Sequence, residues 1–551
     1  MSDYYDLGTY SRKVTAASPE AQLWCDRGLV WAYGFNHDES IACFEKAIAA
    51  DPDCAFAWWG VAYASGCNYN KPWEAFDADE LRTSLARAHR YCTEGLARAG
   101  DATAIEVALL NALARRYQSG EVPGSETFSR WNDDYADAMR EVHRRFPDDL
   151  DVTTLFAEAL MNRTPWALWD LATGGIADGA STGEAKQVME KALERPEALA
   201  HPGLLHMYIH LMEMSPEPER ALKAADALRD LVPDAGHLQH MPTHIDVLCG
   251  HYERVLSSND RAIRADRNYL ERQGPLNFYS LYRCHNYHFK IYGAMWLGQY
   301  GPALATAREM VSTLPEELLL TRSPPMADWL EGFVSMTQHV YIRFGKWQEI
   351  IDQAMPANPE LFCVTTAMMR YAKAVAFAAS GRVPEAEEQA KHFEEAFAAV
   401  PESRMLFNNS CRDILAVARE MMLGEVEYRK GNLDAAFAHL RRSVTLDDGL
   451  PYDEPWGWMQ PTRHALAALL LEQGRVEEAA AVYREDLGLD PALPRAVQHP
   501  DNVWSLTGYH DCLERLGRRE EATIIMQRLT LARGRTDLPV RSSCFCKTGS
   551  A

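Results

Sequence analysis

Long apolar runs are missing from this sequence of 551 residues, and their absence bears on where the protein works. No run is long enough to cross a bilayer, so we expect no membrane partner. Residues 1–6, MSDYYD, lack both the basic segment and the apolar segment of a secretory signal. We therefore expect a cytoplasmic protein.

Basic residues are also scarce. The chain has 56 Lys and Arg against 78 Asp and Glu, which gives a formal net charge of −22. Nucleic-acid phosphates require a basic face, so the composition predicts no nucleic-acid partner. The same excess of acidic residues suits a well-solvated surface.

Several familiar catalytic motifs are missing as well. The sequence has no GxSxG elbow, no P-loop, no Rossmann glycine fingerprint and no HExxH. The sequence therefore carries none of the catalytic signatures that mark these enzyme classes.

The twelve cysteines form no CxxC pair and no regular framework. Most, such as Cys43 and Cys54, lie among apolar residues and are predicted to be buried in a reducing compartment. Cys544 and Cys546 differ, because they lie two residues apart near the end of the chain. That spacing suits a metal-binding pair, a redox pair or a plain tail, and the sequence leaves the choice open.

What the sequence does contain is an internal repeat. Apolar and small residues recur at helical spacing in two runs separated by residues 34–36, and Pro52 ends the unit. Trp58 lies 34 residues after Trp24, where the next unit should begin. The same turn, second helix and stop return at five later glycines: Gly298, Gly381, Gly431, Gly474 and Gly517.

This pattern resembles the tetratricopeptide repeat, a helical hairpin of 34 residues. The resemblance covers roughly residues 20–530 and implies an all-α solenoid of stacked hairpins in a right-handed superhelix. We expect the following organisation along the chain: an N-terminal segment (1–19), N-terminal repeats (20–165), an irregular insertion (166–200), histidine-rich central repeats (201–315), C-terminal repeats (316–530) and a C-terminal tail (531–551).

Two irregular stretches interrupt the repeats. Residues 166–181 contain three glycines and are predicted to form a lid or a cap. Residues 451–458 form an aromatic-rich loop, whose tryptophans either pack between repeats or line a ligand mouth.

The histidines fall at matching positions of the central repeats. In the tetratricopeptide fold, first-helix positions 2, 5 and 9 face the concave groove, and residues four apart share one helix face. Neighbouring helices pack about 8–10 Å apart, so imidazoles from adjacent repeats can converge on a metal. The predicted ligands are His206 and His210, His240 and His244 (34 residues later), and His285 and His288. His237 also occupies position 2.

Carboxylates accompany these histidines. Glu213 follows His210 by three residues, and Glu158 occupies position 9 of an earlier first helix. Each is a candidate general base or further metal ligand. Three more histidines are candidates for the groove, although a lone histidine is usually a packed residue with a hydrogen-bond partner: His37, His339 and His464.

The ligand set restricts the metal without identifying it. Imidazole-rich sites suit copper, iron or zinc. Six histidines would make two three-histidine sites, as in a coupled dicopper centre, whereas Glu158 or Glu213 would favour iron, zinc or manganese. The metal therefore stays open.

A narrower resemblance involves four short segments: 35–39 (FNHDE), 240–245 (HMPTHI), 285–289 (HNYHF) and 543–546 (SCFC). They are similar to those of a group of long tetratricopeptide proteins with histidine-containing motifs, and imply that the motifs belong to one protein type.

Two functions from different classes follow. The first is a metal-dependent enzyme, an oxidoreductase acting on a small molecule in the concave groove. The alternative is a scaffold that binds a peptide or protein partner in that groove without catalysis.

Overall fold

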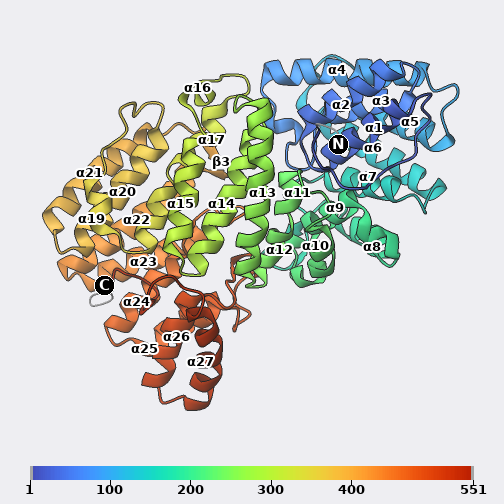
Figure 1. Ribbon diagram of the computed structural model, residues 1–551. Coiled ribbons are helices and arrows are strands. Elements are labelled where there is room, and N and C mark those ends of the chain that lie inside the picture. Colours follow the sequence, from blue (N-terminus) through green and yellow to red (C-terminus); the bar gives the residue numbers. More distant parts are fainter. Residues whose placement is uncertain (1–3, 548–551) are drawn as a thin grey trace. The chain divides into compact units, whose positions relative to one another are not determined.

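The computed structural model describes residues 4–547, and the predicted all-α class is confirmed (Figure 1). Strand is confined there to two antiparallel hairpins of two-residue strands, apart from one isolated bridge between Asn68 and Lys71. The chain forms two compact units. Unit 1 comprises Met1–Ile245 and Arg261–Arg272, and unit 2 comprises Asp246–Asp260 and Gln273–Ala551.

Unit 1 is a series of short helices with one β-hairpin. Its elements are α1 (Pro19–Tyr33), α2 (His37–Ala50), α3 (Ala55–Ala64), η1 (Trp73–Ala75), α4 (Ala78–Ala97), α5 (Ala104–Arg116), α6 (Ser125–Arg145), α7 (Leu150–Met161), β1 (Trp169–Asp170), β2 (Gly175–Ile176), α8 (Thr182–Leu193), η2 (Pro196–Ala200), α9 (Pro202–Glu213), η3 (Pro218–Ala221), α10 (Leu222–Leu228) and α11 (Gly236–His240). Helices α12 (Pro242–Leu248) and α13 (Tyr252–Gln273) contribute residues to both units.

Unit 2 contains the remaining elements. They are α14 (Ser280–Trp296), α15 (Tyr300–Ser312), α16 (Glu316–Leu319), α17 (Met326–Val334), α18 (Met336–Arg343), α19 (Trp347–Asp352), α20 (Cys363–Ala379), α21 (Val383–Ala399), β3 (Met405–Leu406), β4 (Asn409–Ser410), α22 (Cys411–Lys430), α23 (Leu433–Asp448), α24 (Thr462–Glu472), α25 (Val476–Asp486), η4 (Arg495–Val497), α26 (Val503–Arg515) and α27 (Arg519–Arg533).

The first hairpin, α1 with α2, shows why the repeat folds as it does. The chain turns at Gly34, and the side chain of Asn36 caps α2 by accepting a hydrogen bond from the Glu39 amide. Phe44 of α2 then packs against a glycine of each neighbouring helix. A Cβ atom would lie 2.8 Å from the Phe44 ring at Gly28 and 2.4 Å from it at Gly60. The repeat therefore needs glycine at both positions so that three helices can approach closely.

Consecutive helices pack as pairs along both units. In unit 1 the pairs include α3 with α4, α5 with α6, and α7 with α8. In unit 2 they include α20 with α21, α22 with α23, and α26 with α27, and Figure 1 shows α20 to α23 lying side by side. The predicted helical-hairpin architecture is therefore confirmed.

The predicted insertion at residues 166–200 is irregular only in its first half. Strands β1 and β2 form a short hairpin in which Trp169 pairs with Ile176. The Trp169 indole N–H donates to the carbonyl of Leu211 at 2.7 Å, which ties the hairpin to α9. The second half of the stretch contains α8, a regular helix that packs on α7.

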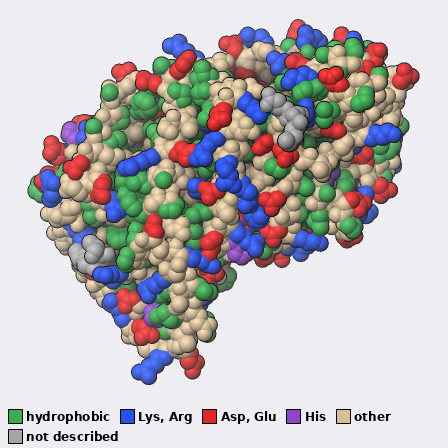
Figure 2. Space-filling view, viewed as in Figure 1, with side chains coloured by type: hydrophobic (Ala, Val, Ile, Leu, Met, Phe, Trp, Pro, Cys, Tyr) green, Lys and Arg blue, Asp and Glu red, His purple; other side chains and the backbone are tan. Residues whose placement is uncertain are grey.

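The surface carries charges of both signs. Figure 2 shows acidic and basic side chains interspersed over the face drawn, while histidine appears at only a few places there. Across residues 4–547, every helix is too short or too polar to span a membrane.

Candidate metal centre

Helix α9 presents two histidines one turn apart. Pro202 occupies its first turn, and the Nδ1 atom of His201 accepts a hydrogen bond from the Leu204 amide as the N-cap. His206 and His210 follow on one face, with ring centroids 4.7 Å apart. Every residue of α9 is buried, so both imidazoles are shielded from solvent.

The next histidines come from a helix that is broken in two. His237 and His240 belong to α11, whereas His244 belongs to α12, which begins at Pro242. Proline lacks the amide hydrogen that a continuous helix would use. The four-residue spacing still brings His240 and His244 together, with their Nε2 atoms 2.7 Å apart.

Three of these histidines make a compact ligand set. One ring nitrogen from each of His206, His210 and His237 lies within 4.8 Å of the others, and all three side chains are 0% exposed. We call these three residues, together with His240 and His244, the imidazole cluster. All five imidazoles are at most 2% exposed, so the cluster is enclosed.

Hydrogen bonds fix which nitrogen carries the proton in two of the rings. His206 Nδ1 lies 2.6 Å from the carbonyl oxygen of Tyr33, which can only accept, so Nδ1 donates. His210 Nδ1 donates in the same way to Glu213 at 2.8 Å. The Nε2 atoms of both rings therefore carry a lone pair, and neither has a hydrogen-bond partner in the described part of the chain.

Glu213 joins the two halves of the cluster. One carboxylate oxygen accepts from His210 Nδ1 at 2.8 Å, and the other accepts from His244 Nδ1 at 2.5 Å. A carboxylate that holds the far nitrogen of an imidazole is the usual support of a metal-binding histidine. The two hydrogen bonds suit Glu213 to orienting both imidazoles, and its role as a general base or further ligand stays a prediction.

Burial keeps the α9 histidines neutral. It lowers the pKa of His206 to about 3. Burial also holds the pKa of His210 well below its usual value, and repulsion from His206 and His244 adds to the effect. Neutral imidazole is the form that ligates metals, so both side chains are in the binding form at neutral pH.

Aromatic rings close the cluster. Between ring centroids, Phe35 lies 4.6 Å from His206. The Phe35 ring also stacks on His210 and His237, with centroid distances of 5.8 Å and 5.6 Å. Tyr69 lies 5.1 Å from His210, and Trp166 lies 6.2 Å from it. Phe35 and Trp166 both have positive φ angles, of 56° and 61°. Such conformations are costly for non-glycine residues and are found preferentially at functional sites.

The structure does not bring Glu158 into this cluster. Its carboxylate, on α7, pairs with Arg116 at 3.2 Å and also accepts from Asn162. Burial raises its pKa, and both partners lower it. Among residues 4–547, Glu158 joins no group whose ligand atoms converge at metal-binding distances. Arg116 therefore pairs with the carboxylate that the sequence suggested as a general base or further metal ligand.

His285 and His288 lie on α14 in unit 2. Phe407, with a φ of 49°, lies 4.9 Å from the His285 ring and stacks on His288 at 6.3 Å. Phe333 lies 5.3 Å from His288. Burial lowers the pKa of His288 to about 3, and neither of its ring nitrogens has a hydrogen-bond partner in the described residues.

The three further histidines that were candidates for the groove lie in different surroundings from one another. His464 is fully hydrogen-bonded, to Asp486 and Ser505 at Nε2 and to Arg343 at Nδ1. His339 lies 5.0 Å from Trp458 in unit 2. His37 lies at the start of α2, with Nε2 3.4 Å from the Asn68 amide nitrogen.

Comparison with known proteins identifies the repeat. A family model described as tetratricopeptide repeat matches residues 21–54, which contain α1 and α2. Residues 21–54 are a tetratricopeptide repeat. No curated protein matches the chain.

Solved structures resemble the chain only distantly. Ypp1 has a TM-score of 0.46 and 8% identity, over 96% of this chain and 82% of that one. The Cut9–Hcn1 hetero-tetramer of APC/C has a TM-score of 0.30 and 13% identity, over 94% and 88%. Naa15/Naa10 bound to HypK-THB has a TM-score of 0.23 and 14% identity, over 93% and 70%. These TM-scores and sequence identities are too low to assign a function to this chain.

The sequence patterns did not single out several residues in or around the cluster. His237 was noted at position 2 but not chosen as a ligand, although His285 at the same position was. Phe35 lies in a segment that the sequence singled out, yet only the fold brings its ring against three histidines. Tyr69 and Trp166 gave no periodic signal, because both lie in irregular segments.

Proposed function

We propose that unit 1 binds a transition-metal ion through His206, His210 and His237. The observation that carries the proposal is the pair of fully buried Nε2 lone pairs on His206 and His210, which have no hydrogen-bond partner in the described residues. A buried acceptor without a partner costs about 1–3 kcal/mol, and a metal ion would remove that cost. His240 and His244 would lie beside this site. Glu213 would orient one ring among the three ligands, His210, and one ring of the neighbouring pair, His244.

The donor set fits copper, zinc or iron, which accept neutral imidazole. Three imidazoles leave coordination positions open, as in catalytic sites, whereas closed structural zinc sites use four protein ligands. We therefore propose further that the centre serves a metal-dependent oxidoreductase acting on a small molecule. A substrate would reach the metal past Trp166, which lies 6.2 Å from His210 between ring centroids and comes just before β1 in the chain.

A binding scaffold is the second candidate. The tetratricopeptide repeat at residues 21–54 favours it, because many such repeats bind peptides or proteins. The imidazole cluster would not line the binding surface in that case, since its side chains are buried. Cytoplasmic location and the absence of a nucleic-acid partner stay predictions from the sequence.

Elemental analysis by plasma mass spectrometry tests the metal proposal directly. Tag-free full-length protein should contain copper, iron or zinc in stoichiometric amount, and a His206→Gln/His210→Gln variant should lose it. A His392→Gln variant is the control, because His392 lies on α21 and is 40% exposed. Metal absent from the native protein, and not taken up by it from solution, would leave the scaffold as the function.

A further inference from the structure

Cys544 and Cys546 form a disulfide, and they differ in this from every other cysteine of the chain. The remaining ten cysteines form no disulfide, and nine of these are buried. The oxidised pair closes a ring across a single intervening residue, Phe545. A bridge between residues so close in sequence removes little loop entropy from the unfolded chain, so it contributes little to the stability of the fold.

The segment that carries this pair is held in place within unit 2. Ser543 is completely buried, and its hydroxyl donates to the His464 carbonyl at 2.8 Å. Tyr483 shares a 2.6 Å hydrogen bond with the same hydroxyl. Arg343 donates to the Ser543 carbonyl, and Arg429 donates to the Cys546 carbonyl. The backbone is therefore anchored on both sides of Cys544, which leaves the sulfur–sulfur bond as the exchangeable part.

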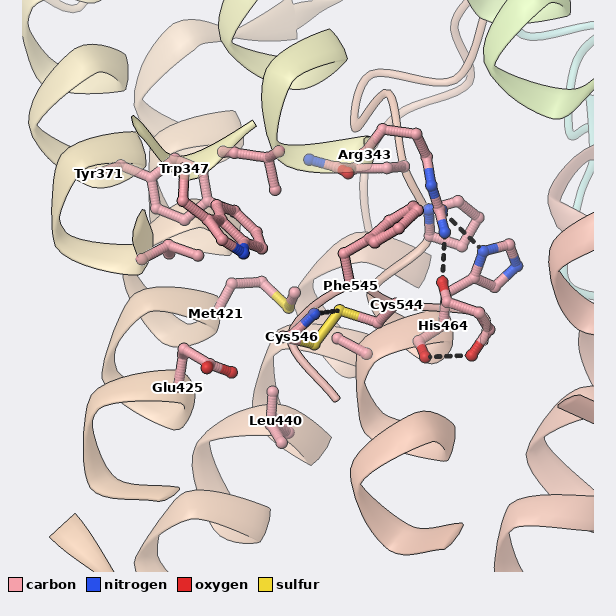
Figure 3. Close-up of a pocket in the computed structure, with 16 residues that line it drawn as sticks. Arg343, Trp347, Tyr371, Met421, Glu425, Leu440, His464, Cys544, Phe545 and Cys546 are labelled. Atoms are coloured by element: carbon pink, nitrogen blue, oxygen red, sulfur yellow. Dashed lines mark hydrogen bonds between the residues drawn. A yellow bond between two sulfur atoms is a disulfide. The ribbon is translucent and has the colours of Figure 1, made fainter. Parts of the chain in front are cut away.

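A small cavity lies beside the disulfide (Figure 3). Its volume is about 40 Å³, and Trp347, Tyr371 and Met421 line it together with the Glu425 carboxylate. A space of this size holds a few water molecules or one small side-chain end, and not a bulky ligand. It leaves room for a small atom group beside the disulfide.

The two sulfurs are not equivalent. Cys546 is 4% exposed, whereas Cys544 is only partly buried. The Cys546 amide donates to the Sγ atom of Cys544 at 3.2 Å. A hydrogen bond to sulfur favours the thiolate, which is the reactive form of cysteine. Cys544 is thus the more exposed residue of the two, and the amide supports its thiolate when a second thiol releases it.

We infer that Cys544 and Cys546 are a thiol–disulfide exchange site that accepts electrons from a thiol. The incoming thiolate attacks Sγ of Cys544, the bond to Cys546 breaks, and the Cys546 thiolate leaves and takes up a proton. A second thiol then attacks the mixed disulfide, forms a disulfide with the first and releases Cys544. Two thiols lose two electrons, and the cysteine pair gains them together with two protons. This site is independent of the imidazole cluster.

Redox titration of the full-length protein tests the exchange. Protein purified without reductant is equilibrated with glutathione at graded ratios of reduced to oxidised form, quenched with acid, alkylated and mapped by mass spectrometry. Cys544 and Cys546 should become alkylated together across that series, with the circular dichroism unchanged. A pair that stays oxidised until denaturant unfolds the protein, or that is already fully reduced on purification, would overturn the inference.

Single variants test the assigned asymmetry. Cys546→Ser should take up one glutathione from its disulfide at Cys544, and Cys544→Ser should react at Cys546 about tenfold more slowly, because access limits exchange. Cys249→Ser is the control, since Cys249 is a partly exposed cysteine outside this segment. Equal rates in the two variants would contradict the asymmetry. Faster reduction by a dithiol protein than by glutathione would identify a partner protein's cysteine as the electron donor. Faster reduction by glutathione would identify a small thiol as the donor.

Discussion

Replacing Glu213 by glutamine removes one charge and keeps the shape of the side chain. The carboxylate now accepts from His210 Nδ1 at 2.8 Å and from His244 Nδ1 at 2.5 Å. A glutamine amide has only one oxygen, so one of the two rings must face its NH₂ group. That ring has to move its proton from Nδ1 to Nε2, or leave two donors facing each other.

A proton on Nε2, the nitrogen that points away from Glu213, prevents that nitrogen from binding a metal ion. Removing a group that orients a metal-binding histidine typically weakens metal binding about 10- to 100-fold, or about 1.4–2.7 kcal/mol. We expect Glu213→Gln to fall in this range. The two hydrogen bonds are charge-assisted and completely buried, which favours the upper half of the range.

Competition titration against a chromophoric chelator, with zinc or cobalt(II), measures the change. Glu158→Gln is the matched control, because Glu158 is equally buried but pairs with Arg116. It should lose stability and keep the metal affinity of the folded protein. Circular dichroism verifies that both variants remain helical.

The reasoning about Glu213 fails if the Glu213→Gln protein binds metal within twofold of the native protein. It fails equally if Glu158→Gln weakens binding by the same factor, because the effect would then follow from loss of any buried carboxylate.

Three further outcomes are expected. Saturating metal, at about 100 times its dissociation constant, should stabilise unit 1 by about 2.7 kcal/mol, seen as a raised thermal midpoint that a chelator reverses. Gly28→Ala should cost about 1–3 kcal/mol in urea unfolding, because its Cβ atom would lie 2.8 Å from the Phe44 ring. Burial lowers the pKa of His339 from 6.5 to about 3, so its neutral form stabilises the fold above pH 6.5, and this stability is lost as pH falls towards 3. Between pH 7 and pH 5 the loss is about 2 kcal/mol, and His339→Gln should flatten the pH dependence of unfolding by that amount.

Each of these outcomes has a control. A Cβ atom at Gly100 meets nothing within 4 Å, so Gly100→Ala should leave the urea midpoint unchanged or raise it. His392→Gln, at an exposed position, should leave the pH dependence of stability as it is. An unchanged thermal midpoint on adding metal would contradict the site itself, since binding to the folded state alone must stabilise it.

The fold follows from the sequence because its signals are local. Gly28, the turn at Gly34 and the cap at Asn36 determine one hairpin through contacts within a few tens of residues. The same signals recur along the chain, so helices and turns can be placed before any tertiary contact is known. The break between α11 and α12 was the exception, although Pro242 is visible in the sequence.

The candidate site was predictable only in part. Register grouped His206, His210, His240 and His244, whose rings are neighbours in the structure, because register depends on the repeat alone. Their role as metal ligands stays a prediction. Register could not show that Arg116 competes for Glu158, or that Phe35 reaches three rings, since these contacts join residues far apart in sequence. It also gave no measure of burial, because the repeat pattern does not reveal what covers its concave side, whereas His206, His210, His240 and His244 are at most 2% exposed in the structure.

The chain itself contains a buried histidine with which the cluster can be compared. His464 is 2% exposed, and both of its ring nitrogens have partners: Arg343 at Nδ1, with Asp486 and Ser505 at Nε2. This is how a packed histidine satisfies its polar atoms. His206 and His210 are buried more completely, yet each satisfies only Nδ1 within the described chain. Packing alone requires no such arrangement on two adjacent turns of α9, whereas a metal ion at the two Nε2 atoms would account for it.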